Sequence, residues 1–231
     1  MTNRRRFYKD VSVTDDLAIA LDGRPVKTPL KASLRLPTRA LADAVAAEWA
    51  AQGEDIKPAS MILTKLANTA IDRVGEHRLA IDQEVLDYAN SDLVCYRTDR
   101  PPDLVALQVK NWNPIVDWAR TDLDAPFEVT SGIIHLPQPE AALSAFAMAL
   151  KNLSDFELSA FYTIMTLTGS ALIAMMLARR AITPDAAWAA AHVDEDYQIE
   201  HWGQDDEARD RRAGRHTEFI DCCRFMDLAR S

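Results

Sequence analysis

The feature that most constrains this chain is an uncharged run from Leu158 to Ala178, inside the segment SDFELSAFYTIMTLTGSALIAMMLARR. A capping box begins the segment, because the Ser154 hydroxyl can accept from the third amide of a helix and Glu157 can reach back to the serine amide. A bilayer is spanned by about 20 apolar residues, so the run is long enough to cross one. It is therefore either a membrane span or a helix buried in a protein core.

The weakly polar residues of this run favour the buried helix. They recur at steps of three and four residues and so form one stripe along a helix: Ser159, Tyr162, Thr163, Thr166 and Ser170. A lone span gains nothing from such a stripe, and Tyr162 lies mid-segment, away from the headgroup level that favours tyrosine. We therefore predict a helix over 155–181 at the centre of an α-helical domain, in which Gly169 lets a neighbouring helix approach closely.

The charge and the cysteines limit the partners and the compartment. A net charge of −9 argues against nucleic acid and anionic membrane, which are bound through excess Lys and Arg, and permits a basic protein partner. The three cysteines, Cys95, Cys222 and Cys223, give neither an even disulfide framework nor a CxxC metal pair, which favours a reducing compartment. The start, MTNRRRFYKD, lacks the apolar run of a secretory signal. We expect a bacterial cytoplasmic location, or the matrix if the protein is mitochondrial.

The N-terminal part of the chain is predicted to form a small antiparallel sheet. Residues 7–36 alternate apolar and polar residues in short runs that turn residues separate. Asp22 and Gly23 form a strong hairpin signal between two of these runs. Three prolines in this region would confine the strands to sheet edges or strand ends.

Helical patterns make up the rest of the chain. Two helices, each ended by a glycine at Gly53 or Gly75, are expected to cover the sheet. Helix-period segments follow at 76–90, 103–120, 139–152, 155–181, 184–201 and 205–229. Pro114 lies inside one of these segments, so we expect a kink or break there. The prediction is an α+β chain: a β-rich domain with two helices over 1–75, then a larger helical domain over 76–231.

The sequence carries no recognised catalytic signature. It contains no Walker loop, GxGxxG, nucleophile elbow or HExxH motif. None of its five histidines has the Glu-x-x-His spacing of di-iron bundles, and His201 would lie opposite His192 on a helix, so we expect no metal site. Cys95 has no histidine near it in sequence, and we interpret it as a small buried hydrophobe rather than a nucleophile.

The strongest local anomaly is the segment HVDEDYQIEHWGQDDE, residues 192–207, which is rich in acids and contains no Lys or Arg. One interpretation is that the acids compensate helix dipoles and form a solvated face. The other is that a block of like charge is costly unless something basic covers it. In that case the block is a docking surface, with Tyr197 and Trp202 as aromatic anchors for a protein partner.

Several segments together resemble one protein family. In order from about Arg5 to Trp202 they are RRFYKDVSV, LDGRPVKTP, AVAAEWAAQ, MILTKLANTAID, DLVCYR, LQVKNWNPIVDWA and EDYQIEHWG. On these motifs the chain resembles the assembly chaperones of the ATP synthase catalytic head, specifically those that handle the alpha subunit.

The resemblance implies a non-enzymatic function without a cofactor. Such a chaperone covers the apolar surface of an unassembled alpha subunit, which would otherwise invite aggregation, until the beta subunit replaces it. Because the complex must be displaceable, we expect a modest, partly polar interface. The resemblance, with Trp202 added as an anchor, implies these partner-binding residues: Glu195, Glu200, Trp202, Asp205, Asp206 and Glu207.

The other tryptophans are expected to be structural. Trp49 is spaced with Leu41 and Val45 on one helix face, and Trp112 and Trp118 also fit core positions better than contact positions. We further expect a monomer that does not insert into membranes. Two other classes remain as alternatives: an enzyme that uses Cys95 or an acidic pair, and a peripheral membrane protein that uses residues 158–178.

Overall fold

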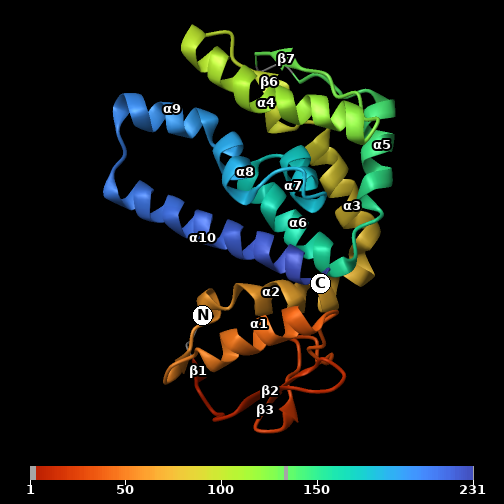
Figure 1. The fold of residues 1–231 in the computed structure, drawn as a ribbon, viewed down its shortest axis with the longest axis vertical. Helices are drawn as coiled ribbons and strands as arrows, with labels where there is room; N and C mark the ends of the chain where they lie inside the picture. Colours follow the sequence, from red (N-terminus) through yellow and green to blue (C-terminus); the bar gives the residue numbers. More distant parts are fainter. Residues whose placement is uncertain (1–3, 133–134, 231) are drawn as a thin grey trace. The chain divides into compact units, whose positions relative to one another are not determined.

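The computed structural model describes residues 4–132 and 135–230, which divide into two compact units. Unit 1 comprises the described residues up to Arg78, the segment Ser154–Ala160 and the described residues from Ile220 onward. Unit 2 comprises the described parts of Leu79–Leu153 and Phe161–Phe219. Three of the helices labelled in Figure 1 therefore contribute residues to both units: α3 (Gly75–Ala89), α6 (Asp155–Thr168) and α10 (Asp206–Leu228). The predicted division at residue 75 did not assign these later segments to the first unit.

The sheet of unit 1 is small and antiparallel, as predicted. Strands β2 (Val11–Val13), β3 (Ile19–Leu21) and β4 (Arg24–Pro25) pair in that order, and β1 (Arg4–Arg5) pairs separately with β5 (Asp55–Ile56). The predicted hairpin turn joins β3 to β4, with φ of 47° at Asp22 and 75° at Gly23. Positive φ at both central residues is what the two-residue turn of a twisted hairpin requires.

Helix α1 (Arg39–Ala50) covers this sheet. The Thr38 hydroxyl caps it by accepting from the amide of Leu41, and Leu41 and Val45 are fully buried on its inner face. The same hydroxyl donates to the Leu228 carbonyl at 2.6 Å, so the end of α10 is tied to the start of α1 within unit 1. A 3₁₀ turn, η1 (Pro58–Ser60), leads into α2 (Ile62–Thr69).

The second predicted helix does not end at Gly75. Helix α2 passes through a π-helical segment, η2 (Ala70–Val74), into α3 (Gly75–Ala89), and the helical backbone is interrupted two residues later by a kink at His77 (φ −114°, ψ 17°). Gly75 has φ −58° and ψ −42°, an ordinary helical conformation, whereas a glycine ends a helix when it takes the left-handed one. In the π-helical segment the buried Asp72 accepts from the Thr28 hydroxyl at 2.6 Å and from the Leu30 amide at 3.0 Å, which fixes the loop after β4.

Unit 2 is almost wholly helical. Its remaining elements are η3 (Leu93–Cys95), the parallel pair β6 (Tyr96–Arg97) and β7 (Thr130–Ser131), α4 (Pro102–Asp122), α5 (Glu140–Leu150), α7 (Ala171–Ala178), α8 (Pro184–Ala191) and α9 (Val193–Trp202). Helix α4 continues through Pro114, so the break expected there does not occur.

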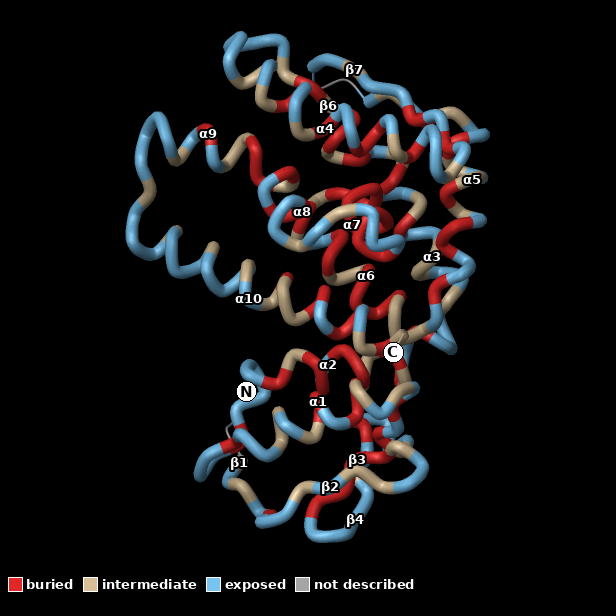
Figure 2. The backbone as a smooth tube through the Cα atoms, in the orientation of Figure 1, coloured by how far each residue is buried: buried red, intermediate tan, exposed pale blue. Residues whose placement is uncertain are grey.

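The uncharged run forms two helices rather than the single predicted one. Gly169 takes φ 70° and ends α6, and Ser170 begins α7 by accepting from the Ile173 amide. A Cβ at Gly169 would lie 3.8 Å from the side chain of Leu93, an ordinary van der Waals contact, so the neighbouring segment is the short 3₁₀ helix η3 rather than an α-helix. Every residue of α7 is buried (Figure 2), and none of the described helices is long and apolar enough to cross a membrane.

The polar groups at the start of this run have defined partners. The predicted capping box is present, with the Ser154 amide 2.8 Å from Glu157 Oε2 and the Glu157 amide 3.3 Å from Ser154 Oγ. In the polar stripe, the Ser159 hydroxyl donates to the Leu66 carbonyl and the Tyr162 hydroxyl donates to Glu84. The stripe therefore supplies hydrogen bonds to α2 and α3.

A fully buried carboxylate joins the break in this run to η3. Asp92 accepts from the Leu172 amide at 2.9 Å and from the Val94 amide at 3.1 Å. Burial raises the pKa of Asp92 from its ordinary 3.8 to about 6, and the hydrogen bonds from Ser170 and the amides limit the rise. The site is apolar enough that ionising Asp92 at neutral pH lowers the stability of the folded chain.

Replacing Asp92 by Asn should flatten the pH dependence of stability. Between pH 3.8 and about 6 the folded chain keeps a proton on Asp92 that the unfolded chain loses, so the free energy of unfolding falls as pH rises. In Asp92→Asn that fall should be smaller by about 3 kcal/mol, the equivalent of two pKa units. Urea unfolding at pH values above and below this interval measures it. Exposed Asp99→Asn is the control, and equal slopes in wild type and Asp92→Asn would contradict the assignment.

Candidate functional site

The acidic segment predicted as a docking surface lies on α9 and the first turn of α10. The predicted helix over 184–201 is interrupted at His192, whose φ of −115° and ψ of 21° separate α8 from α9. Helix α9 ends at Gly203 with φ 77°, and α10 begins at Asp206. Helices α9 and α10 therefore form a hairpin with the acids on both sides of its turn (Figure 1).

Arginines of α10 cover the acids of α9. Arg215 Nη2 lies 2.9 Å from both carboxylate oxygens of Glu195, and Arg212 pairs with Asp196. The segment itself contains no Lys or Arg, but RDRRAGR begins one residue after it, at Arg209, and the hairpin folds these residues back onto α9. Glu195, predicted to bind a partner, is thus paired within unit 2.

The acids after the turn have local partners. Asp205 Oδ1 accepts from the Ala208 amide at 2.7 Å and caps α10. Asp206 pairs with Arg209 at 2.8 Å, and Glu207 pairs with Arg211 at 2.7 Å. All three carboxylates also lie at the N-terminus of α10, where negative charge is favoured by the helix dipole.

The last turn of α9 keeps two predicted residues available to solvent. Trp202 is 76% exposed, and Glu200 is exposed with no ion pair among the described residues. Tyr197 supports this turn, because its hydroxyl donates to Asp103 Oδ2 at 3.0 Å and its ring stacks on His201 at 4.0 Å. The same hydrogen bond lowers the pKa of Asp103, which keeps that carboxylate ionised. Figure 2 shows the surrounding turn as largely exposed.

The histidines of the segment do not gather into a metal site. His192 is buried, its ring stacks on Trp188 at 3.8 Å, and burial lowers its pKa, so the ring is neutral at neutral pH. His201 instead contacts Tyr197 and Trp202. Within residues 4–132 and 135–230, no group of three or more His, Cys, Asp or Glu residues is placed to hold an ion.

Cys95 does not have the environment of a nucleophile. Its side chain is buried, and burial together with the neighbouring Asp92 raises the pKa of the thiol far above neutrality. The thiolate that nucleophilic catalysis needs is therefore disfavoured.

The three tryptophans predicted as structural lie in different surroundings. Trp112 is 1% exposed, and its Nε1 donates to the Ala190 carbonyl at 2.7 Å. Trp118 is half-buried on α4. Trp49 is also half-buried: it packs against the cluster of Tyr8 and its neighbours, and it lines an open hollow.

The family model described as ATP12 chaperone protein matches residues 5–120, just over half of the chain. This chain belongs to the ATP12 chaperone family. The match confirms the resemblance of the sequence motifs. It ends before α9 and α10, so it does not cover the acidic segment.

Relatives of the ATP12 family extend the likeness over most of the chain. A mitochondrial Atp12 protein of Schizosaccharomyces pombe is 22% identical over an alignment of 221 residues, and the alignment covers 89% of this chain and 76% of that protein. The crystal structure of Atp12 from Paracoccus denitrificans is 39% identical with a TM-score of 0.90, over 97% of this chain and 98% of that chain. A putative chaperone from Agrobacterium tumefaciens is 42% identical with a TM-score of 0.94, over 98% and 86% of the two chains.

In this ATP12 family member, the Glu195–Arg215 pair should stabilise the hairpin of α9 and α10. Both side chains are partly exposed, so a double-mutant cycle with Glu195→Gln and Arg215→Gln should give a coupling of about 0.5–1 kcal/mol in urea unfolding. Arg211→Gln combined with Glu195→Gln is the matched control, because Arg211 pairs with Glu207 instead. A coupling no larger than in the control would contradict an intramolecular role for Glu195.

Proposed function

We propose that this protein is an assembly chaperone of the ATP synthase catalytic head that binds the unassembled alpha subunit. It covers the surface that the beta subunit later buries, and assembly releases it. The observation that carries the proposal is membership of the ATP12 chaperone family, joined to sequence motifs that resemble its alpha-handling members. The choice of the alpha subunit rests on that resemblance.

The last turn of α9 is the proposed contact surface for the client. Trp202 offers an exposed aromatic ring, and Glu200 offers an exposed carboxylate that has no ion pair among the described residues. Protein interfaces use this combination of anchor and charge. The acids that pair with arginines contribute less, because a partner must first break an ion pair to reach them. Glu195, Asp206 and Glu207 therefore set the shape of this surface, whereas Glu200 and Trp202 contact the client.

A contact made mainly by one tryptophan and one carboxylate suits a complex that has to dissociate. One exposed tryptophan, buried in a partner's pocket, contributes about 2–3 kcal/mol, and a rim carboxylate mainly accelerates and orients association. Such a contact prevents aggregation of the client while leaving it displaceable by the larger alpha–beta interface.

Capture of isolated subunits tests the proposal directly. The immobilised protein is incubated with isolated alpha or isolated beta subunit of its own ATP synthase. We expect capture of alpha and not of beta, weakening with added salt because charged groups take part, and release of alpha when beta is added. Equal capture of both subunits, or of neither, would refute the proposed client.

Substitutions in the last turn of α9 test the contact surface. Trp202→Ala and Glu200→Lys should each weaken alpha capture by about tenfold or more, corresponding to about 1.4 kcal/mol or more. Thermal unfolding should change little, because both side chains are exposed. Leu79→Ala, also at an exposed apolar residue, is the control. If both variants capture alpha as well as wild type does, this surface is not the contact.

A further inference from the structure

A second apolar surface lies within unit 1. Two adjoining hollows of about 670 Å³ and 610 Å³ share three lining residues, Trp49, Ile56 and Pro58. We call them together the Trp49 groove. A site for one small molecule typically measures about 300–1,000 Å³, so two hollows side by side exceed the needs of one compact ligand and suit an elongated one.

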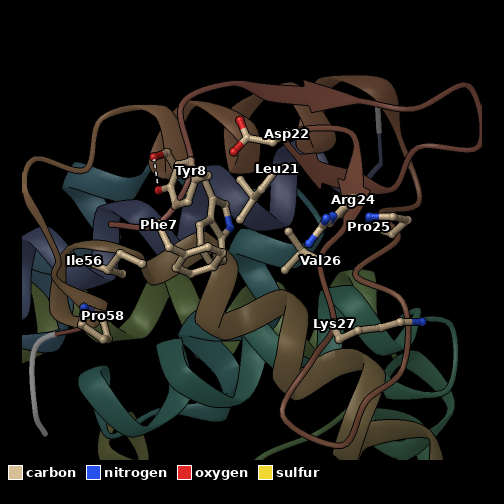
Figure 3. A pocket seen from close by; sticks show the side chains of 11 residues that line it. Phe7, Tyr8, Leu21, Asp22, Arg24, Pro25, Val26, Lys27, Ile56 and Pro58 are labelled. Carbon is tan, nitrogen blue, oxygen red and sulfur yellow. Dashed lines mark hydrogen bonds between the residues drawn. The ribbon is translucent and has the colours of Figure 1, made fainter. Parts of the chain in front are cut away.

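The lining of the groove is mainly apolar. Figure 3 shows the first hollow, with Phe7, Ile56 and Pro58 toward one side and Val26 and Pro25 toward the other. The ring of Phe7 is 61% exposed there, and the second hollow adds Met61 and Ile62. Large apolar side chains that remain open to solvent mark a place where another molecule binds.

The walls of the groove are fixed by hydrogen bonds. The Tyr8 hydroxyl donates to the Trp49 carbonyl at 2.7 Å, and the Arg6 guanidinium donates to the carbonyls of Tyr8 and Gln52, so the N-terminal segment is held against the end of α1. On the other side, the Glu48 carboxylate accepts from the amides of Leu63 and Thr64 and holds the start of α2. A pre-formed groove lowers the entropy lost on binding.

Two residues that line the second hollow carry buried hydrogen-bonding atoms that no described residue satisfies. Trp49 Nε1, a donor, and Asn68 Oδ1, an acceptor, are buried and have no partner among the described residues. Leaving such groups unsatisfied costs about 1–3 kcal/mol each. A polypeptide main chain offers both an acceptor and a donor at every residue, so a small reorientation of these two side chains lets it satisfy them.

The charged side chains that line the first hollow favour a bound molecule with negative charge at that end. The chain carries a net charge of −9, yet the exposed side chains of Arg24 and Lys27 line this hollow and have no ion pair among the described residues. Asp22, the acid beside them, already accepts from the amides of Lys9 and Asp10 through Oδ1, and these bonds lower its pKa. The groove thus has a cationic end that complements a carboxylate.

We propose that the Trp49 groove binds an extended, largely apolar polypeptide segment of the client, with an acidic side chain against Arg24 and Lys27. Alternate side chains of an extended segment lie about 6–7 Å apart on one face, so two of them enter the hollows on either side of Trp49. The inference rests on the proposed function for the identity of the client. It adds a second, peptide-binding surface to the contact on α9.

Peptide binding tests the proposal with the full-length protein. Short overlapping peptides that cover the alpha and beta subunits are screened, and the tightest binder is labelled and followed by fluorescence anisotropy. We expect an apolar alpha-derived peptide that carries an acid. Phe7→Ser should weaken its binding about tenfold, and Trp49→Phe, which keeps a ring but removes the donor, should weaken it by a smaller factor.

A charge swap distinguishes the groove from nonspecific binding. The Lys27→Glu variant should bind the native peptide more weakly than wild type does. It should bind a peptide in which the acid is replaced by lysine more tightly than wild type does. Val109→Ser and Lys110→Glu on α4 are the matched controls, since both residues are exposed in unit 2. Thermal unfolding of each variant confirms that it is folded.

The outcomes separate this inference from the proposed function. If alpha is captured but no alpha peptide binds, or Phe7→Ser and Lys27→Glu bind as wild type does, the groove proposal is overturned and the chaperone proposal stands. If groove-dependent peptide binding occurs but intact alpha is not captured, the groove binds peptides and the proposed client is wrong. Groove-dependent dimerisation in sedimentation would make a second copy the occupant and would also overturn the proposal.

Discussion

The core of unit 2 depends on hydrogen bonds to the backbone amides and carbonyls at the break in the uncharged run, between α6 and α7. At Gly169 the helix ends in an apolar interior, where unpaired amides and carbonyls are costly. The Gly169 carbonyl accepts from the Leu93 amide, Ser170 caps the new helix, and Asp92 takes the Leu172 amide. Because these groups have partners, α7 can be buried on every side, and the surrounding helices pack against it.

The structural features that depend only on neighbouring residues were predicted well from the sequence. The turn at Asp22 and Gly23 and the capping box of Ser154 and Glu157 are each decided by a few adjacent residues. The glycines show the limit of such reasoning. Gly75 was predicted to end a helix and Gly169 to lie inside one, but only Gly169 adopts a positive φ. The packing of Leu93 beside Gly169 is a tertiary contact that no local pattern contains.

The candidate site shows the same limit for ion pairs, because the partners of a charged residue can lie outside the segment that contains it. The segment 192–207 looks uncompensated when taken alone, and the family resemblance assigned five of its seven acids to partner binding. Folding back α10 brings Arg212 and Arg215 onto Asp196 and Glu195, and separates paired acids from the available Glu200. The basic run after the segment was visible in the sequence, and an antiparallel helical hairpin would have placed it correctly. The Trp49 groove gave no such signal, because its lining comes from strands, loops and two helices.

The composition of unit 1 has a consequence for how the chain can be made and cut. The fully buried Phe225 stacks on Phe156, and Arg230 bonds to Glu157. These residues belong to unit 1 together with residues from the first third of the sequence. The residues up to Arg78 therefore lack these contacts until the segment from Ile220 onward has been synthesised. Cutting after Arg78, or removing residues 220–230, would expose apolar residues that unit 1 buries. We therefore expect that residues 4–78 do not fold as an independent domain, because residues 154–160 and 220–230 complete unit 1.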